Sequence, residues 1–241
     1  MAQYVFQRKE QKFMLDSAQC DALQALLDDR LQRSVYGKSA VCNVYFDTPD
    51  HRLIRRSVEK PVYKEKLRIR SYGTVGENDR VFLEMKKKYK GIVYKRRVEL
   101  QEAEAFSYMA DPAAPLNGGQ IGNELDYFKQ FYRELQPAVY LSYDRLAWFD
   151  PAGSDLRVTV DYNVRYRTDS LRLSAPMGGT PLLEEGKYLL EVKSSAAIPM
   201  WLTEFLSSRK IYKISFSKYG MVYTGMLQKQ LQEKRGLQHA R

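Results

Sequence analysis

Charged side chains alternate with apolar ones along segments of this chain that otherwise read as β-strands. The pattern covers residues 64–70, 84–86, 95–97, 157–161 and 191–193. Successive strand side chains point to opposite faces of a sheet, so each segment sends a row of charges to one face and mostly apolar residues to the other. One such strand is typical of a solvated antiparallel sheet. Because the pattern recurs in these five segments, with bases outnumbering acids, we expect a sheet that curls until its charged faces converge.

Basic residues on these faces form rows that stability alone explains poorly. The clearest row consists of Lys64, Lys66, Arg68 and Arg70. Alternate strand residues lie about 7 Å apart, so like charges in such a row repel one another. Phosphate oxygens would offset the repulsion, because Arg offers a bidentate pair of donors and Lys a compact point charge. In a longer alternation, the residues on one predicted face are Arg157, Thr159, Asp161, Asn163, Arg165 and Arg167. We therefore expect the converging faces to bind a polyanion.

Single carboxylates interrupt the bases, and each precedes a lysine by two residues. The three pairs are Glu10 with Lys12, Glu84 with Lys86 and Glu191 with Lys193. Carboxylates among bases can hold Mg²⁺ or Mn²⁺, hard cations that often bind through one or two carboxylates and the phosphates of a substrate. The alternative is that the Glu and Lys of each pair merely neutralise each other on a solvent-exposed face of the sheet. The occurrence of three pairs beside the basic rows favours a metal site.

The overall charge also points to anionic partners. The chain has 241 residues, a formal net charge of +10 and a pI near 9.4, which suits nucleic acid, a membrane surface or a phosphate-rich small molecule. Cys20 and Cys42 lack metal-binding spacing, so we expect reduced thiols and no zinc site. The N-terminus becomes charged too early for a signal peptide, and no apolar run approaches the roughly 20 residues of a membrane span. These features predict a cytoplasmic protein.

The predicted elements suit an α+β fold. Strands are expected at about 4–13, 40–46, 62–71, 80–88, 92–100, 138–149, 156–167 and 188–194. Helices are expected from Asp16 or Ser17, from about 124 to 135, after Pro199 and at the basic C-terminus. Because no linker is visible, we expect one domain over 1–241, with a core at about 4–220 and a basic helix or tail at 221–241. Many antiparallel strands with a few covering helices predict a closed β-barrel of about eight strands, since closure removes sheet edges.

The motifs of other common phosphate-binding and nucleophilic sites are missing. The sequence contains no GxxxxGKS/T loop, no GxGxxG after a strand and no GxSxG. Its two histidines are His51, in a predicted turn, and His239, near the C-terminus, so a histidine-based site is not expected. Aromatic side chains near the bases could stack on single-stranded nucleic acid, but most fall on the opposite strand face, where we expect them in the core.

An ordered set of short motifs extends over nearly the whole chain, from about Phe6 to Gly220. The set is Glu10-x-Lys12, Tyr45-Phe46-Asp47-Thr48, Lys66-x-Arg68-x-Arg70, Glu84-x-Lys86, Lys95-x-Arg97, Tyr143-x-Arg145, Arg157 to Asp161, Glu191-x-Lys193 and Ser217-Lys218-Tyr219. It resembles the VTC domain, the catalytic module of polyphosphate polymerases within the wider CYTH or triphosphate tunnel metalloenzyme group. The resemblance implies a closed antiparallel tunnel in which the γ-phosphoryl group of ATP passes to a growing polyphosphate chain, with Mn²⁺ or Mg²⁺ as cofactor.

The resemblance also implies roles for individual residues. Those expected to act directly on the triphosphate are Lys12, Arg68, Arg70, Lys86, Arg97, Arg145, Lys193 and Lys218. Further phosphate or product contacts are expected from Lys66, Lys95, Arg157 and Ser217, the last at a tunnel mouth. Arg165 is added to them because it shares the polar row of its strand with Arg157. Glu191 is the expected metal ligand, with Glu10 and Glu84 as helpers. The expected partners are ATP or another triphosphate and polyphosphate, without nucleic acid; a separate membrane protein remains a possible associate.

Three alternatives stay open at this point. The same tunnel could hydrolyse tripolyphosphate or nucleoside triphosphates, since water can replace the phosphate acceptor. A module that binds polyphosphate without turnover would carry the same basic rows. A nucleic-acid binder would exploit the same net positive charge, and competition between tripolyphosphate and RNA would distinguish it.

Overall fold

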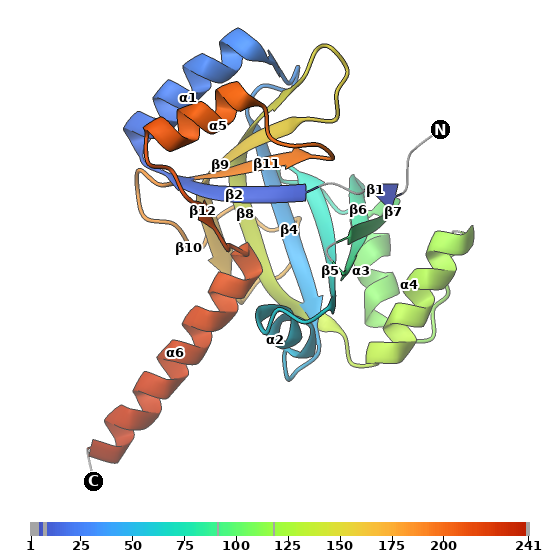
Figure 1. The fold of residues 1–241 in the computed structure, drawn as a ribbon. Helices are drawn as coiled ribbons and strands as arrows, with labels where there is room; N and C mark the ends of the chain where they lie inside the picture. The colour runs from blue at the N-terminus through green and yellow to red at the C-terminus, as the bar shows by residue number, and fades with distance from the viewer. Residues whose placement is uncertain (1–4, 7–8, 91, 118, 240–241) are drawn as a thin grey trace.

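A strongly curled antiparallel sheet organises the computed structural model, which describes residues 5–6, 9–90, 92–117 and 119–239 (Figure 1). The strands are β1 Val5–Phe6, β2 Lys9–Leu15, β3 Gln32–Arg33, β4 Ser39–Asp47, β5 Tyr63–Tyr72, β6 Arg80–Tyr89, β7 Ile92–Gln101, β8 Gln136–Phe149, β9 Arg157–Arg167, β10 Thr180–Pro181, β11 Tyr188–Ser194 and β12 Lys213–Ile214. The helices are α1 Ser17–Arg30, α2 Arg52–Val58, α3 Glu102–Ala110, α4 Gly119–Tyr132, α5 Met200–Ser208 and α6 Lys218–His239. The long predicted strands are confirmed to within a few residues, whereas α2 and α3 were not predicted.

The order of the strands shows that the sheet is open. The hydrogen-bonded order is β1-β7-β6-β5-β4-β8-β9-β11-β2-β12, with β10 beside β9 and β3 beside β8. Among the described residues no ladder joins the two ends, so the prediction of a closed eight-stranded barrel is wrong: the sheet has 12 strands and does not close. The reason lies in β2. One of its edges pairs with β11, and β12 takes the other edge at Lys12 and Phe13, which leaves that stretch unavailable to the opposite end of the sheet.

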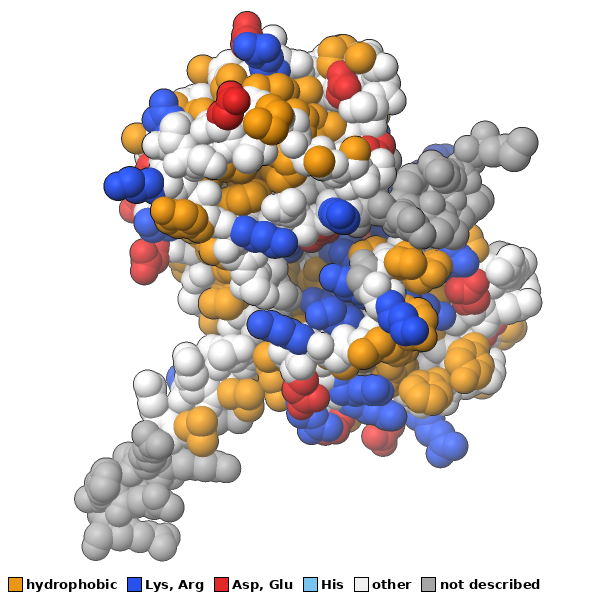
Figure 2. Space-filling model, viewed as in Figure 1, with side chains coloured by type: hydrophobic (Ala, Val, Ile, Leu, Met, Phe, Trp, Pro, Cys, Tyr) orange, Lys and Arg blue, Asp and Glu red, His pale blue; other side chains and the backbone are white. Residues whose placement is uncertain are grey.

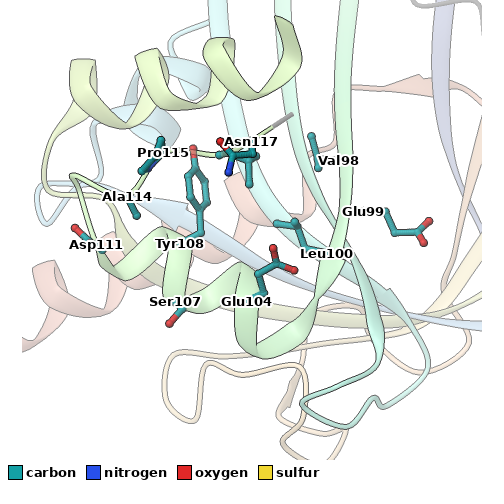
Figure 3. A pocket seen from close by; sticks show the side chains of 11 residues that line it. Val98, Glu99, Leu100, Glu104, Ser107, Tyr108, Asp111, Ala114, Pro115 and Asn117 are labelled. Atoms are coloured by element: carbon teal, nitrogen blue, oxygen red, sulfur yellow. The ribbon is translucent and has the colours of Figure 1, made fainter. Parts of the chain in front are cut away.

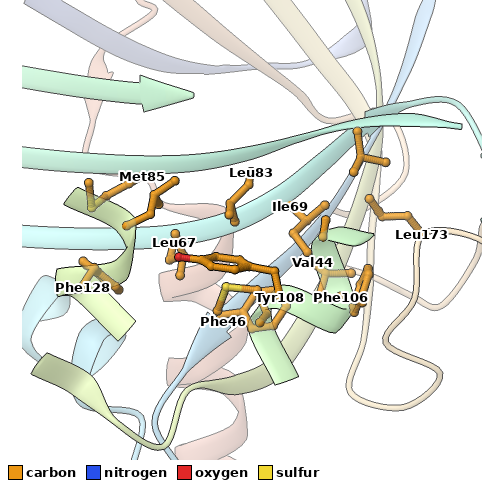
Figure 4. Packing of buried hydrophobic residues seen from close by; sticks show 14 of the residues in the cluster. Val44, Phe46, Leu67, Ile69, Leu83, Met85, Phe106, Tyr108, Phe128 and Leu173 are labelled. Carbon is orange, nitrogen blue, oxygen red and sulfur yellow. The ribbon is translucent and has the colours of Figure 1, made fainter. Parts of the chain in front are cut away.

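Helices cover the convex face of the sheet in two places. The helices α1 and α5 pack on β2, β9 and β11 through a cluster that includes Leu15 and Val160. The helices α3 and α4 pack on β4, β5 and β6 through a second cluster, which includes Leu67, Ile69 and Leu83 (Figure 4). Because strand side chains alternate between faces, this packing turns the charged rows of the same strands toward the concave side. The predicted separation of apolar and charged rows is confirmed in β5, β6 and β11, and in β9 as far as Asp161.

The start of α1 illustrates how local sequence sets an element boundary. Asp16 caps the helix: its carboxylate accepts a hydrogen bond from the Gln19 backbone N–H at 2.8 Å, and the Gln19 side chain accepts from the Asp16 backbone N–H at 3.1 Å. This reciprocal pair is a capping box. Cys20, Leu23 and Leu27 then recur at helical spacing and are buried against the sheet.

The first turns of α6 are fixed at one end of the concave face. Asp47, at the end of β4, is fully buried and accepts hydrogen bonds from the backbone N–H groups of Leu53 at 2.8 Å and Ile54 at 3.0 Å. It also accepts one from the Tyr219 hydroxyl at 2.9 Å, which ties β4 to both α2 and α6. Beyond these turns α6 projects from the body (Figure 1). The predicted C-terminal helix is confirmed as far as His239, and residues 240–241 of the predicted tail lie outside the described residues.

Lys129 of α4 holds the end of α3. It is only 3% exposed, and its ammonium donates to the backbone carbonyl oxygens of Tyr108 at 2.8 Å, Asp111 at 2.7 Å and Ala114 at 2.9 Å. The last carbonyls of a helix lack intrahelical partners, so this ammonium acts as a C-terminal cap supplied by another helix. Burial lowers the pKa of Lys129, but Asp126 and Asp111 oppose that effect.

We expect Lys129→Met to lower the free energy of unfolding by about 2–4 kcal/mol, because three carbonyl groups would lose their donor in a buried place. Urea denaturation monitored by circular dichroism measures this change. Lys187→Met, at an exposed lysine, is the matched control and should change stability by less than about 0.5 kcal/mol. Equal stability of the two variants would contradict the capping role.

Candidate functional site

Basic side chains from several strands and from α6 gather on the concave face of the sheet, which we call the lumen. Figure 2 shows blue side chains within the hollow at the centre of the molecule. The lumen bases are Lys12, Lys66, Arg68, Arg70, Lys86, Lys95, Arg145, Lys193 and Lys218. The carboxylates among them are Glu10, Glu84, Asp161 and Glu191. The alternation of β2, β5–β9 and β11 supplies these side chains from segments far apart in the sequence, except for Lys218, which begins α6.

Two buried carboxylates, Asp161 and Glu191, lie on the β9–β11 side of the lumen. Asp161 is fully buried and receives a bidentate pair from Arg145, at 2.6 and 2.7 Å, and the Lys218 ammonium at 2.5 Å. The cations within 4 Å of the Glu191 carboxylate are Lys193 at 2.8 Å, Lys12 at 3.2 Å, Arg145 at 3.5 Å and Lys218 at 3.7 Å. Burial alone would raise the pKa of both carboxyls, but the surrounding cations hold the pKa of Asp161 and of Glu191 below the usual range.

A third buried carboxylate, Glu84, lies on the β5–β7 side. It is 2% exposed, and Arg68 donates to one of its oxygens from Nε at 2.9 Å and from Nη2 at 2.8 Å. Arg70 lies 3.7 Å from the same oxygen, and the Lys95 ammonium lies 2.5 Å from the other. Burial would raise the pKa of Glu84, but Arg68, Arg70 and Lys95 hold it well below its usual range. Arg68 also donates to the Tyr45 hydroxyl at 3.0 Å.

Side-chain contacts connect the two sides across the lumen. Glu10 of β2 forms an ion pair with Lys86 of β6 at 3.6 Å. The Lys66 ammonium of β5 donates to the Ser217 hydroxyl, beside the start of α6, at 2.9 Å. Lys12 donates to the Phe216 carbonyl oxygen at 3.0 Å. Although the backbone ladder is open, the lumen is thus crossed by polar contacts that a bound anion could replace.

The residues proposed for a metal can be tested against this geometry. Glu10 and Glu191 both contact the Lys12 ammonium, at 3.3 and 3.2 Å, so the two carboxylates flank one cationic position. Within the part of the chain that is described, no three Asp, Glu, His or Cys side chains gather into a metal-binding group. Mg²⁺ and Mn²⁺ commonly bind through one or two carboxylates with substrate phosphates completing the shell, so Glu191 and Glu10 fit this mode of binding. Glu84 lies apart from them, among Arg68, Arg70 and Lys95.

Three expected phosphate-binding residues lie at the periphery or outside the lumen. Arg97 is exposed, with its guanidinium 4.3 Å from the centre of the Phe82 ring. Arg157 is exposed at the start of β9, opposite Lys193. Arg165 is exposed and donates to the Gly179 carbonyl oxygen at 3.0 Å.

A bulge in β9 explains the position of Arg165. The β8–β9 register shifts between Ser142 and Asp144, and Asn163 has a φ of 50°. The extra residue reverses the alternation. Val160 therefore packs with α1 and α5, whereas Val164 packs with α6. The prediction that one face of β9 runs unbroken from 157 to 167 is wrong beyond Asp161, because Asn, which tolerates positive φ, interrupts it.

Sequence reasoning missed some residues that the structure places in the lumen. Asp161 belonged to a recognised motif and to the charged face of its strand, so alternation could have assigned it. Tyr45 is buried, its ring centroid lies 5.0 Å from that of Tyr219 at a tilted angle, and its hydroxyl accepts a hydrogen bond from Arg68. The buried hydroxyl of Thr159, opposite Glu191 in the sheet, has no hydrogen-bond partner among the described residues.

A separate pocket of about 580 Å³ lies between β7, α3 and the loop after α3 (Figure 3). Its carboxylates already have local roles: Glu104 accepts from the Gln101 backbone N–H, Asp111 accepts from the Ala113 backbone N–H, and Glu99 pairs with Arg80. The pocket lacks the basic character of the lumen. We therefore assign the candidate site to the lumen.

Comparison with solved structures defines the class of fold. A candidate adenylate cyclase from Bacillus halodurans superposes with a TM-score of 0.56 at 15% identity, covering 88% of this chain and 96% of that one. A candidate adenylyl cyclase from Hippeastrum, described as having a dominant triphosphatase activity, gives a TM-score of 0.54 at 18% identity, covering 90% and 95%. The chain therefore shares its fold with these two proteins.

The family follows from the sequence itself. The family model of the VTC domain matches residues 7–227. The chain belongs to the VTC domain family. No curated protein sequence gives a significant match. No helix within the described ranges is long and apolar enough to cross a membrane.

Proposed function

We propose that this protein is a metal-dependent phosphotransferase that transfers the γ-phosphoryl group of ATP to a growing polyphosphate chain in the lumen. The observation that supports this most is the convergence of five lumen bases on the Glu10 and Glu191 carboxylates: Lys12, Lys86, Arg145, Lys193 and Lys218. Bases so close together repel one another, and a triphosphate with its metal would offset that repulsion. Membership of the VTC domain family adds support for phosphate chains over other polyanions.

The proposed chemistry needs no protein nucleophile. A terminal oxygen of the acceptor chain forms a bond to the γ-phosphorus as the bond from that phosphorus to the β–γ bridging oxygen breaks, releasing ADP. Arg68, Arg145 and Lys218 would orient the phosphates and offset charge on the equatorial and leaving oxygens. Glu191 and Glu10 would hold a divalent cation, which when bound supplies Lewis-acid stabilisation of phosphoryl oxygens. Lys12, between these carboxylates, would shift its ammonium toward the phosphates.

Incubation of the purified protein with ATP and Mn²⁺ tests this proposal. Products are resolved on a gel stained for polyphosphate, and orthophosphate is assayed in parallel. We expect chains that lengthen with time, together with ADP in matching amounts. Absence of both chains and orthophosphate across Mn²⁺ and Mg²⁺ concentrations would contradict an enzymatic role and favour a binding module.

Hydrolysis of triphosphates is the second candidate. A structural relative is described as having a dominant triphosphatase activity, although at 18% identity the likeness itself shows only the fold. The same lumen could serve hydrolysis, because water would replace only the acceptor oxygen. Orthophosphate release without chain growth, at every concentration of added short polyphosphate, would identify this reaction.

The lumen also predicts a pH dependence. Burial lowers the pKa of Lys66 to about 8. Burial also lowers the pKa of Lys95 to about 8, although the nearby Glu84 carboxylate partly opposes this effect. For Tyr45, burial would raise the pKa, but Arg68 and Lys66 bring it to about 8. Each group is more positive below its pKa, so raising the pH through 8 removes positive charge from the free lumen. We expect kcat/KM for ATP to fall as pH rises from about 7 to 9.5.

Lys66→Arg provides the control for this pH profile. Arginine stays protonated across the range, so the variant should lose less kcat/KM than the wild type between pH 8 and 9.5. Profiles of kcat/KM in matched buffers at constant ionic strength give the comparison. Identical falls in the two proteins would show that Lys66 does not titrate in this range.

A further inference from the structure

Exposed aromatic and basic side chains share one face of the molecule, outside the lumen. We call it the α2–α4 face; it comprises α2, the residues that lead into β5, the β6–β7 turn and the outer side of α4. Its exposed apolar side chains are Val58 at 43%, Val62 at 64%, Tyr63 at 37%, Tyr89 at 45%, Tyr127 at 65% and Phe131 at 48%. Its exposed bases are Arg55, Arg56, Lys60, Lys88, Lys90 and Arg133. Figure 2 shows orange and blue side chains mixed at the lower right.

Contacts join these segments into one surface. The Tyr63 and Tyr89 rings lie 6.4 Å apart, and the Lys90 backbone N–H donates to the Val62 carbonyl oxygen at 3.1 Å. Glu65 accepts hydrogen bonds from the hydroxyls of Tyr63 and Tyr132, which connects the start of β5 to α4. On α4 itself, the Tyr127 and Phe131 rings stack with centroids 6.2 Å apart.

Cations lie directly against these aromatic rings. The Arg52 guanidinium is 5.4 Å from the centre of the Phe131 ring and 5.3 Å from the centre of the Tyr132 ring. The Lys90 ammonium is 5.5 Å from the centre of the Tyr89 ring. The exposed carboxylates on the same segments are fewer: Asp50, which pairs with Arg55 at 2.8 Å, Glu59 and Glu134. The face therefore combines apolar surface with a net positive charge.

We propose that the α2–α4 face docks on a bilayer that contains anionic lipids. Tyrosine and phenylalanine rings lie favourably at the boundary between headgroups and acyl chains, and long basic side chains extend from that boundary to lipid phosphates. The exposed Lys60, Lys88 and Lys90 favour a lipid surface over a protein partner, because protein interfaces are depleted in Lys and enriched in aromatic residues and Arg. The net charge of +10 complements such a surface.

This docking would place one side of the lumen near the membrane. Tyr63 begins β5, and the next residue, Lys64, starts the basic row that continues to Lys66 and Arg68. The Lys64 ammonium donates to the Ser57 carbonyl oxygen of α2 at 3.3 Å, so the basic row begins at the border of the docking face. The proposal concerns binding and does not depend on which reaction the lumen performs.

Cosedimentation of the full chain with vesicles tests the proposal. One set of vesicles contains phosphatidylcholine alone, and the other contains about one third phosphatidylserine. We expect binding to the second set only, weakened by added salt. Tyr127→Ala with Phe131→Ala should weaken it about tenfold. Arg56→Gln with Lys88→Gln should weaken it about 10- to 30-fold, because each base near an anionic surface contributes roughly one kcal/mol.

Exposed aromatics elsewhere supply the matched control. Tyr36 is 81% exposed and lies before Ser39, the first residue of β4, whereas α2 follows Asp47, at the other end of that strand. Tyr212 is 73% exposed and follows α5. Tyr36→Ala with Tyr212→Ala should bind vesicles as the wild type does, and thermal melts confirm folding of all variants. Failure to bind anionic vesicles, or equal binding by every variant, would overturn the proposal. Binding of single-stranded RNA that both face variants lose, without vesicle binding, would assign the face to nucleic acid instead.

Discussion

Replacing Glu191 with glutamine should lower the proposed metal-dependent turnover of ATP by at least about 1,000-fold, because the proposed metal position would lose its most buried carboxylate. The lumen would also gain one unit of positive charge. We therefore expect tripolyphosphate, measured by calorimetry without metal, to bind at least as tightly as in the wild type. Loss of turnover with retained anion binding would separate the metal role from a general need for negative charge.

The stability of this variant needs its own measurement. Glu191 is 6% exposed among four cations, and removing a buried ionic partner can cost about 3–5 kcal/mol. Assays should therefore run well below the melting temperature of the variant. Glu204→Gln, at an exposed glutamate of α5, is the control and should keep full activity. Undiminished turnover in Glu191→Gln would rule out the proposed metal role.

Replacing Arg145 should produce the second largest effect. Arg145→Met would remove the bidentate partner of the fully buried Asp161, so we expect a loss of about 3–5 kcal/mol in stability and of about 100- to 1,000-fold in kcat/KM. Arg145→Lys keeps the charge but loses the fork geometry. It should recover most of the stability, yet remain about tenfold below the wild type in kcat/KM. Chemical denaturation and steady-state kinetics on the same samples give both quantities.

Arg165→Met is the matched control for Arg145→Met. Both residues were expected from the sequence to contact phosphate, but Arg165 lies beyond the β9 bulge, exposed and bound to a backbone carbonyl. Its replacement should leave the KM for ATP unchanged and alter stability by less than about 1 kcal/mol. A large rise in KM for Arg165→Met would mean that the substrate extends well outside the lumen.

The features that could be predicted from the sequence are those set by local alternation. The charged and apolar rows of β5 and β6 were assigned to the correct faces, because Leu67, Ile69 and Leu83 could be buried only on the helix-covered side. The helix cap at Asp16 could also be predicted from the sequence, because an acidic residue just before an apolar helical stripe can accept a hydrogen bond from a free backbone N–H group of the first turn. Placement of Lys12 near Glu191 followed only from family resemblance, because the two residues lie far apart in the chain.

The features that could not be predicted depend on tertiary competition. Closure of the barrel fails because β12 takes an edge of β2 that no local pattern marks as occupied. The β9 bulge does not disturb the alternation of residue types in the sequence, so it could not be predicted from that pattern, yet it turns Arg165 away from the lumen. The early start of α4 depends on a close approach: a Cβ at Gly122 would lie 2.4 Å from the Leu116 carbonyl oxygen, so glycine there serves packing between chain segments.

The pairing of β2 with β11 has a consequence for how the protein is made. Lys12 and Glu191 are direct partners in that ladder, so β2, near the start of the chain, can pair only after β11 has been synthesised. Contacts of such sequence separation form slowly, after the local hairpins. On the ribosome, β4 to β7 and their helices could assemble early, while the lumen stays incomplete until nearly the whole chain has emerged. During that interval Arg68 and Lys95 already have Glu84 as a partner, but Lys12 lacks Glu191. Cellular polyphosphate or another anion could then stabilise the nascent sheet as a folding ligand.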